Sequence, residues 1–200
     1  MAGSFDTRPS LLMRIRNPAD AAAWGEFVRI YTPLVYRHCR RAGLQEADAA
    51  EVSQEVFAQV ARSASGFAYE PARGRFRDWL GAVVRSRLAR FFARSGKTPD
   101  LLDGQSLDQH PSAPLDPAWM DDFNAHVLAE ALARVRGEFG PEHWQAFESV
   151  WRDGRPAAEV AASAGLTIVA VYVLKSRVIR RLREEARLLT DDVPYFDPPL

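Results

Sequence analysis

Aromatic side chains alternate with arginines between residues 67 and 87, a combination that suits single-stranded nucleic acid. Bases stack on aromatic rings at about 1–3 kcal/mol per base, while guanidinium groups bind the phosphate backbone. Phe76, Leu80, Val83 and Val84 share one helix face and predict core packing instead, and Trp79 fits either role. The candidates for strand binding are Phe67, Tyr69, Arg73, Arg75, Arg77, Trp79, Arg85 and Arg87.

A second candidate site, for duplex DNA, lies near the end of the chain. Ala161 is small enough for a close helix crossing, Gly165 permits the positive φ of a tight turn, and Thr167 can cap the next helix. In a helix-turn-helix motif this second helix enters the major groove. A plain helical hairpin with a solvated basic face is the alternative. Val160, Ala164, Leu166, Val171 and Leu174 fill the apolar positions; Thr167, Val169, Ala170, Tyr172 and Val173 would face DNA bases; Lys175, Ser176, Arg177, Arg180 and Arg181 would face phosphates or bases.

Catalytic and metal-binding constellations are missing from the sequence. Cys39 is the only cysteine, which excludes an intrachain disulfide and a multi-cysteine zinc site. The four histidines, His38, His110, His126 and His143, are scattered, and we expect no metal site. Neither a nucleophile–base arrangement nor a glycine-rich phosphate loop supports catalysis. We therefore expect a protein that is not an enzyme and needs no cofactor.

The elements that must position these candidates are predicted to be almost entirely helical. Helix formers dominate, and no segment alternates with period two for long. Pro33 predicts a break or kink in the first long helical region, and Gly43 predicts its end. Ser63–Gly74 reads as a loop, and the Pro-rich tail as non-helical. The predicted helices are Asp20–Ala42, Asp48–Ala61, Phe76–Arg94, Phe123–Phe139, Pro141–Asp153, Pro156–Ala164 and Thr167–Leu189.

The charge is distributed in blocks, although the formal net charge of the 200 residues is zero. Arg73 to Lys97 and Lys175 to Arg187 are basic, whereas Thr98 to Asp122 carries six Asp and neither Lys nor Arg. That acidic block also contains four prolines and shows no periodicity. We therefore predict two all-α domains, residues 1–97 and a helix-turn-helix domain over 123–190. A flexible acidic linker over 98–122 joins them, and a tail over 191–200 follows.

Asp48 is a plausible N-cap, with Glu51 three residues on as in a capping box. At 100° per residue Asp48, Glu51 and Glu55 line one helix face, and valines with Phe57 cover the other. By itself this is a solvated acidic face. Together with Phe76–Leu80 (FRDWL), however, the segment resembles the extracytoplasmic-function sigma factors of the sigma-70 family, whose acidic helix reads D-A-E-D-L-V-Q-E-x-F. The opening RPSLL and RNPADAAAW-like segments resemble a planctomycete-like subgroup of that family.

The resemblance implies core RNA polymerase and promoter DNA as partners, with an anti-sigma factor as a further possible one. The acidic helix would bind a coiled coil of the largest polymerase subunit, through Asp48, Glu51, Gln54, Glu55 and Phe57. The loop Phe67 to Gly74 would capture a flipped base of the −10 element, and the helix-turn-helix would bind the −35 element. The chain would direct the polymerase to promoters and assist promoter melting.

The chain also departs from the family pattern. Ser86 stands where Asn is usual, and Arg90 where Asp is frequent. The recognition helix has Ala170 to Leu174, AVYVL, in place of T-V-K-S-R, which leaves fewer polar groups for reading bases.

The alternative reading is a helix-turn-helix regulator with an N-terminal sensor or dimerisation domain. Such a regulator would need neither the acidic helix nor FRDWL. The start MAGSFDTRPS lacks a signal-peptide core, and no apolar run could span a membrane, so we expect a cytoplasmic protein.

Overall fold

The computed structural model describes residues 10–64, 75–96 and 116–191, and these form helices and connecting turns without a strand. The all-α class predicted from the sequence is confirmed. The chain divides into two units, Met1–Phe123 and Asn124–Leu200. Each unit has its own buried core, so each is described separately.

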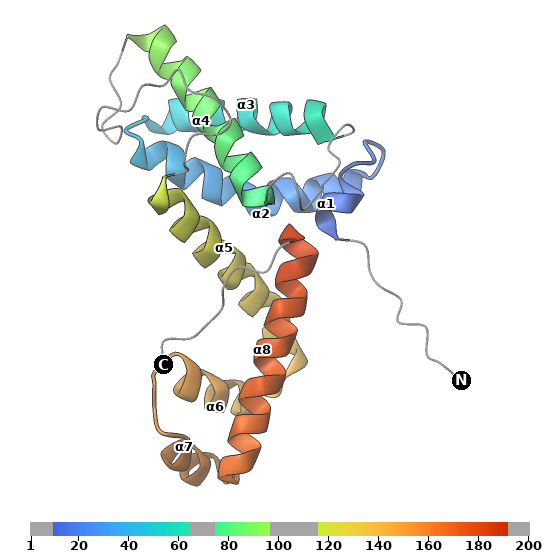
Figure 1. The fold of residues 1–200 in the computed structure, drawn as a ribbon, viewed down its shortest axis with the longest axis vertical. Helices are drawn as coiled ribbons and strands as arrows, with labels where there is room; N and C mark the ends of the chain where they lie inside the picture. Colours follow the sequence, from blue (N-terminus) through green and yellow to red (C-terminus); the bar gives the residue numbers. More distant parts are fainter. Residues whose placement is uncertain (1–9, 65–74, 97–115, 192–200) are drawn as a thin grey trace. The chain divides into compact units, whose positions relative to one another are not determined.

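The first unit consists of α1 (Leu11–Arg14), α2 (Ala21–Arg41), α3 (Glu46–Ala64), α4 (Phe76–Ser95) and the first residues of α5 (Pro117–Val135). In Figure 1, α3 contacts both α2 and α4, and α1 lies against α2. Asp20 begins α2 by accepting a hydrogen bond from Ala23 N at 2.9 Å. At its end Gly43 adopts φ 89°, the left-handed conformation predicted for it.

Two local predictions about these helices are wrong. Of the break or kink predicted at Pro33, the break is wrong: α2 continues through Pro33, and the nearby Tyr31, Leu34 and Val35 are buried in the core. Asp48 is not the N-cap of α3, because the helix already begins at Glu46 and Ala49 N donates to Gln45 O. Asp48 therefore lies in the first turn, where a carboxylate interacts favourably with the helix dipole.

Aromatic rings form the centre of the first unit. Phe27, Tyr31 and Phe76 are fully buried, with ring centroids 4.8 Å apart for Phe27–Tyr31 and 5.3 Å apart for Tyr31–Phe76. Trp119 and Phe123 of α5 complete this core, and Phe123 stacks on Tyr31 at 6.1 Å. The sequence predicts a linker over 98–122, yet residues 117–122 are helical because Trp119 is anchored in this core.

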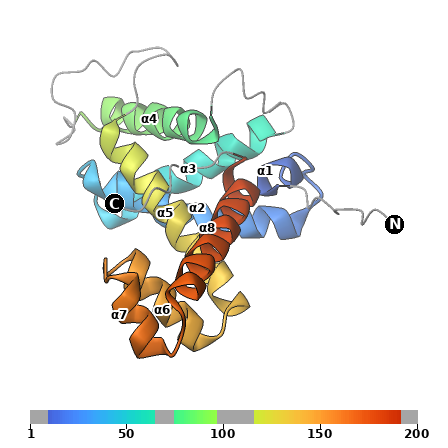
Figure 2. The same ribbon diagram turned by 60° about the horizontal axis from the view of Figure 1, so that its bottom comes forward.

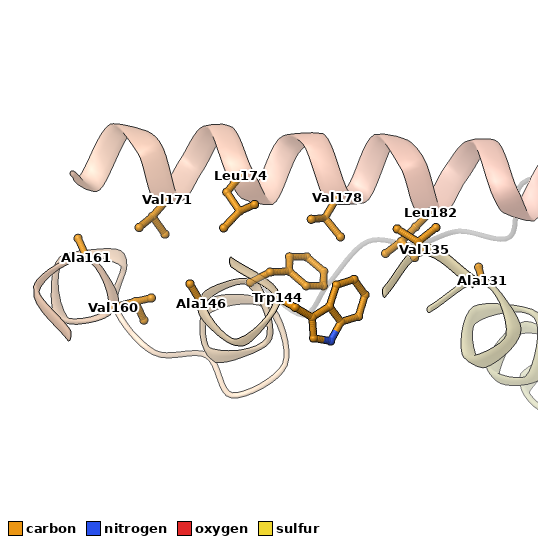
Figure 3. Packing of buried hydrophobic residues seen from close by; sticks show 11 residues of the cluster. Ala131, Val135, Trp144, Ala146, Val160, Ala161, Val171, Leu174, Val178 and Leu182 are labelled. Carbon is orange, nitrogen blue, oxygen red and sulfur yellow. The ribbon is translucent and has the colours of Figure 1, made fainter. Parts of the chain in front are cut away.

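The second unit contains the rest of α5, a short 3-10 turn η2 (Arg136–Glu138), α6 (Pro141–Trp151), α7 (Ala157–Ala164) and α8 (Ile168–Thr190). Figure 2 shows α6 and α7 beside the first half of α8, and all three contact one another. Val171, Leu174 and Val178 point from α8 towards α6 and α7 (Figure 3). The apolar positions predicted for this helix pair are the ones that pack together: Val160, Val171 and Leu174 are buried, and Ala164 and Leu166 lie partly buried against them.

Candidate nucleic-acid interface

The turn between α7 and α8 has the local geometry that its residue types predict. Gly165 adopts φ 65°, and Thr167 Oγ1 accepts a hydrogen bond from Ala170 N at 3.1 Å. The two helices are bent by 102° relative to each other. This angle falls in the range of helix-turn-helix motifs.

The outer face of α8 is apolar over its first two turns. Because Val171 and Leu174 fill the core, residues on the opposite side of the helix point to solvent. Val169 is 71% exposed, Tyr172 56% and Val173 51%. Thr167 is exposed as well, and Ala170 is half-buried. This set coincides with the positions predicted to face bases, and Ile168, 47% exposed, adds an apolar residue that the sequence did not single out.

Further along α8 the surface becomes basic. Lys175 is half-buried, and Ser176, Arg177 and Arg180 are exposed. Tyr172, Val173, Ser176, Arg177 and Arg180 line an open depression on this side of the helix. Among the described residues no acidic side chain pairs with Lys175 or Arg177, and Arg180 approaches Glu184 only to 4.0 Å while 70% exposed.

Arg181 differs from these cations because it is bound within the protein. Its guanidinium donates to Glu138 at 2.5 and 2.7 Å and to Glu184 at 2.7 Å, and it lies 3.9 Å from Glu185. These hydrogen bonds lower the pKa of Glu138 and raise the pKa of Arg181. No local pattern predicts this arrangement, since Glu138 is 43 residues away in the chain.

On α3 the predicted docking residues fall into two groups. Glu51 and Gln54 are exposed and Asp48 is half-buried. Glu55 instead accepts from Arg94 of α4 at 3.1 Å and lies 3.9 Å from Arg87. Phe57 is half-buried, with its ring 6.0 Å from that of Phe27. Of the five predicted docking residues, Glu51 and Gln54 are thus the fully exposed ones.

On α4 the predicted strand-binding residues have mixed surroundings. Arg75 is exposed at the N-cap, where its backbone N donates to Asp78. Arg77 is buried, and its carbonyl accepts from Trp119 Nε1 at 3.0 Å. Arg85 is half-buried, and so is Trp79, whose ring lies 5.9 Å from that of Phe76. Arg87 donates to Gln59 of α3 at 2.7 Å. Phe67, Tyr69 and Arg73 lie outside the described residues.

Residues 27–98 match the family model of sigma-70 region 2. The chain is 27% identical over 169 residues to the ECF RNA polymerase sigma factor SigE of Mycolicibacterium smegmatis, which covers 84% of this chain and 62% of that protein. It is also 27% identical over 192 residues to the ECF RNA polymerase sigma factor RpoE of Cereibacter sphaeroides, covering 88% and 92%. Residues 27–98 thus match sigma-70 region 2, and most of the chain is similar to extracytoplasmic-function sigma factors.

Among solved structures, this chain is similar to Rhodobacter sphaeroides SigE in complex with the anti-sigma ChrR. The TM-score is 0.37 and the identity 24%, with 87% of this chain and 94% of that chain covered.

The described part of the chain was also compared with the requirements of a metal site and of a membrane-spanning helix. No group of three or more His, Cys, Asp or Glu side chains there could hold a metal ion. No single described helix is long and apolar enough to cross a membrane; α7 and α8 pass that test only as a pair, across their 102° bend.

Proposed function

We propose that this chain is an extracytoplasmic-function sigma factor, which binds core RNA polymerase and recognises promoter DNA at two places. In the first unit, α3 would contact the polymerase, and the segment from Phe67 to α4 would hold the separated −10 strand. In the second unit, α8 would enter the major groove of the −35 element. Residues 1–97 would then act as region 2 and 123–190 as region 4, connected by residues 98–122, of which 117–122 form the start of α5. The protein would act by binding, without a catalytic reaction of its own.

The observation that carries this proposal is the solvent-facing first half of α8 behind a capped, glycine-containing turn. The N-terminal residues of a recognition helix contact base edges, and cations beyond them bind phosphates. Val169 and Val173 are exposed at the first positions, and Arg177 and Arg180 follow on the same side. This order, read along one helix, supports insertion into duplex DNA.

For the polymerase, the surroundings of the acidic residues favour Glu51 as the sharper probe. A substitution at Glu55 would also remove its bonds to Arg94 and Arg87, which join α3 to α4. Glu51 is exposed, and no described residue pairs with it. Its charge is thus available to a partner surface of opposite sign.

The test is assembly of holoenzyme with Glu51→Lys. We expect the affinity for core enzyme to fall by about tenfold or more, because a like charge would face the basic partner surface. Helical content should not change. Glu142→Lys, on an exposed acidic residue of α6, is the matched control and should bind as wild type. Unaltered affinity of the Glu51 variant would remove α3 from the polymerase interface.

Run-off transcription on genomic fragments tests the function as a whole. Core enzyme with this protein should initiate at specific sites, whereas core enzyme alone should not. Duplex binding by the free protein as a dimer, with no core enzyme bound, would instead indicate a helix-turn-helix regulator. An anti-sigma partner, the planctomycete-like subgroup and cytoplasmic residence stay predictions.

A further inference from the structure

The first two turns of α8 carry almost no group that could hydrogen-bond to a base. From Ile168 to Leu174 only Tyr172 has a polar side-chain atom. Major-groove readout commonly uses Arg on guanine or Asn and Gln on adenine, and these are missing here. Yet Val169, Tyr172 and Val173 are more than half exposed, so they contribute little to the core of the second unit. Exposed apolar residues that lie together on one helix face are typical of a binding surface.

The charge next to this face indicates what the partner is. Lys175, Arg177 and Arg180 follow the exposed valines within the next two turns of α8. Ser176, Arg177 and Arg180 line the same depression as Tyr172 and Val173. An apolar strip followed by cations complements a groove that has apolar groups on its floor and negative charges along its edges. The major groove of duplex DNA has this arrangement, with thymine methyl groups on the floor and phosphates at the edges.

The apolar group in the major groove is the C5-methyl of thymine. We infer that Val169 and Val173 read thymine methyl groups, so that this helix selects its site by apolar contact in place of hydrogen bonds. The inference rests on the proposed entry of α8 into the major groove. The two valines are one turn apart, roughly 6 Å along the axis. This equals about two base-pair steps of roughly 3.4 Å, and it places the selected thymines on adjacent or next-adjacent pairs.

The experiment starts from duplexes of random sequence, selected by holoenzyme containing the full chain. We expect enriched sites to contain thymines at one or two fixed positions of the upstream element. Each such thymine is then replaced by uracil, which lacks only the methyl group. Every lost methyl contact should weaken binding about fourfold, since the free energy of burying one methyl-sized group corresponds to about a fourfold change in the dissociation constant.

The variant Val169→Ala/Val173→Ala separates a direct contact from an effect on DNA shape. If the valines touch the methyl groups, this variant should bind thymine and uracil probes equally, because the coupling is lost with either partner. Val28→Ala, at an exposed valine of α2, is the matched control and should retain the fourfold preference.

Equal binding of thymine and uracil probes by the wild-type protein would overturn the inference and leave the proposed function intact. A thymine preference that persists in the double variant would also overturn it. Failure of the holoenzyme to bind any duplex would remove the proposed function together with the inference. Capture of an apolar protein segment that the double variant loses, with no effect of uracil, would assign the face to a protein partner instead.

Discussion

Two arginines one turn apart on α8 have different surroundings, and these predict different roles. The sequence predicts DNA contact for Arg177 and Arg181 alike. In the structure Arg177 is exposed, whereas Arg181 is held by Glu138, Glu184 and Glu185. A guanidinium already bound by carboxylates must lose those bonds before it can reach a phosphate. Arg181 therefore belongs to the packing of the second unit.

This difference is measurable as a salt dependence. We expect Arg177→Ala to lower the slope of log binding constant against log salt by about 0.9, the value for one phosphate contact. Arg181→Ala should leave the slope unchanged and reduce the free energy of unfolding by roughly 1 kcal/mol, because these ion pairs are partly exposed and screened. Duplex binding of holoenzyme at several salt concentrations gives the first quantity, and urea unfolding gives the second. A reduced slope in Arg181→Ala would return this residue to the DNA surface.

We expect His38 to make the stability of the first unit depend on pH. Its ring lies edge-on to Trp119 at 5.1 Å, and within the described part of the chain its Nδ1 has no hydrogen-bond partner. Burial lowers the pKa of His38 below its ordinary value of 6.5; Asp116 opposes this shift and Arg41 adds to it. At a pH just below 6.5 the imidazole is therefore protonated in the unfolded chain but still neutral in the folded one. The contribution of this neutral group to the free energy of unfolding is fully present above pH 6.5 and declines as the pH falls below it.

We expect the urea midpoint of the wild-type protein to fall more between about pH 6.5 and 5 than that of His38→Gln. His143→Gln, at an exposed histidine of α6, serves as the control and should follow the wild-type curve. Parallel curves for wild type and His38→Gln would show that this imidazole is not buried as a neutral group.

At the scale of elements, the turn before α8 depends on one backbone conformation. A Cβ added at Gly165 would meet nothing within 4 Å, so a substitution there is strained only through its φ of 65°. We expect Gly165→Ala to cost about 1–2 kcal/mol. Gly25→Ala has equal space but lies inside α2 without a positive φ, and it should stabilise by about 0.5–1 kcal/mol. Thermal unfolding followed by circular dichroism compares the two variants. Equal effects would show that the turn tolerates a side chain.

Local patterns predicted these elements well where the cause is itself local. Gly165, Thr167 and the apolar spacing of Val171 and Leu174 act within a few residues of one another. The α3 start is different: Asp48 has a capping residue type, but helix geometry is already established at Glu46. Local patterns also fail at Pro33. Proline tends to break a helix, but the packing of the residues around it outweighs this tendency, and α2 continues.

At the scale of the whole molecule, the first residues of α5 help to stabilise the first unit. Trp119 is 1% exposed and donates to the carbonyl of Arg77, and Arg41 forms an ion pair with Asp122. We expect Trp119→Ala to reduce the free energy of unfolding by about 3–5 kcal/mol. Trp119→Phe keeps most of the volume but removes the hydrogen bond to the Arg77 carbonyl, so it should cost less, about 0.5–1.5 kcal/mol for that bond.

Urea titration of the full chain, followed by circular dichroism, measures both variants. Met120→Ala is the control, and it should cost less because that side chain is only half-buried. A wild-type midpoint for Trp119→Ala would show that this segment does not contribute to the core.

The sequence could not place Trp119, since its partners Arg77 and His38 are 42 and 81 residues away. The residues around it are rich in proline and aspartate, which indicates a linker. The ion pair of Glu55 with Arg94, 39 residues apart, is invisible for the same reason. The average composition of this segment predicts a linker, but the single buried side chain of Trp119 makes residues 117–122 part of the first unit.

This anchoring has a practical meaning for chimaeras between family members. A junction chosen by composition, at Lys97 or within the acidic block, would bring foreign residues against Tyr31 and Phe76 of the recipient. The ring of Phe123 contacts both of those rings, and Trp119 contacts His38 and Phe123, so the hybrid would lose part of its own core at the graft. A seam placed after Phe123, inside α5, keeps each core with its own residues.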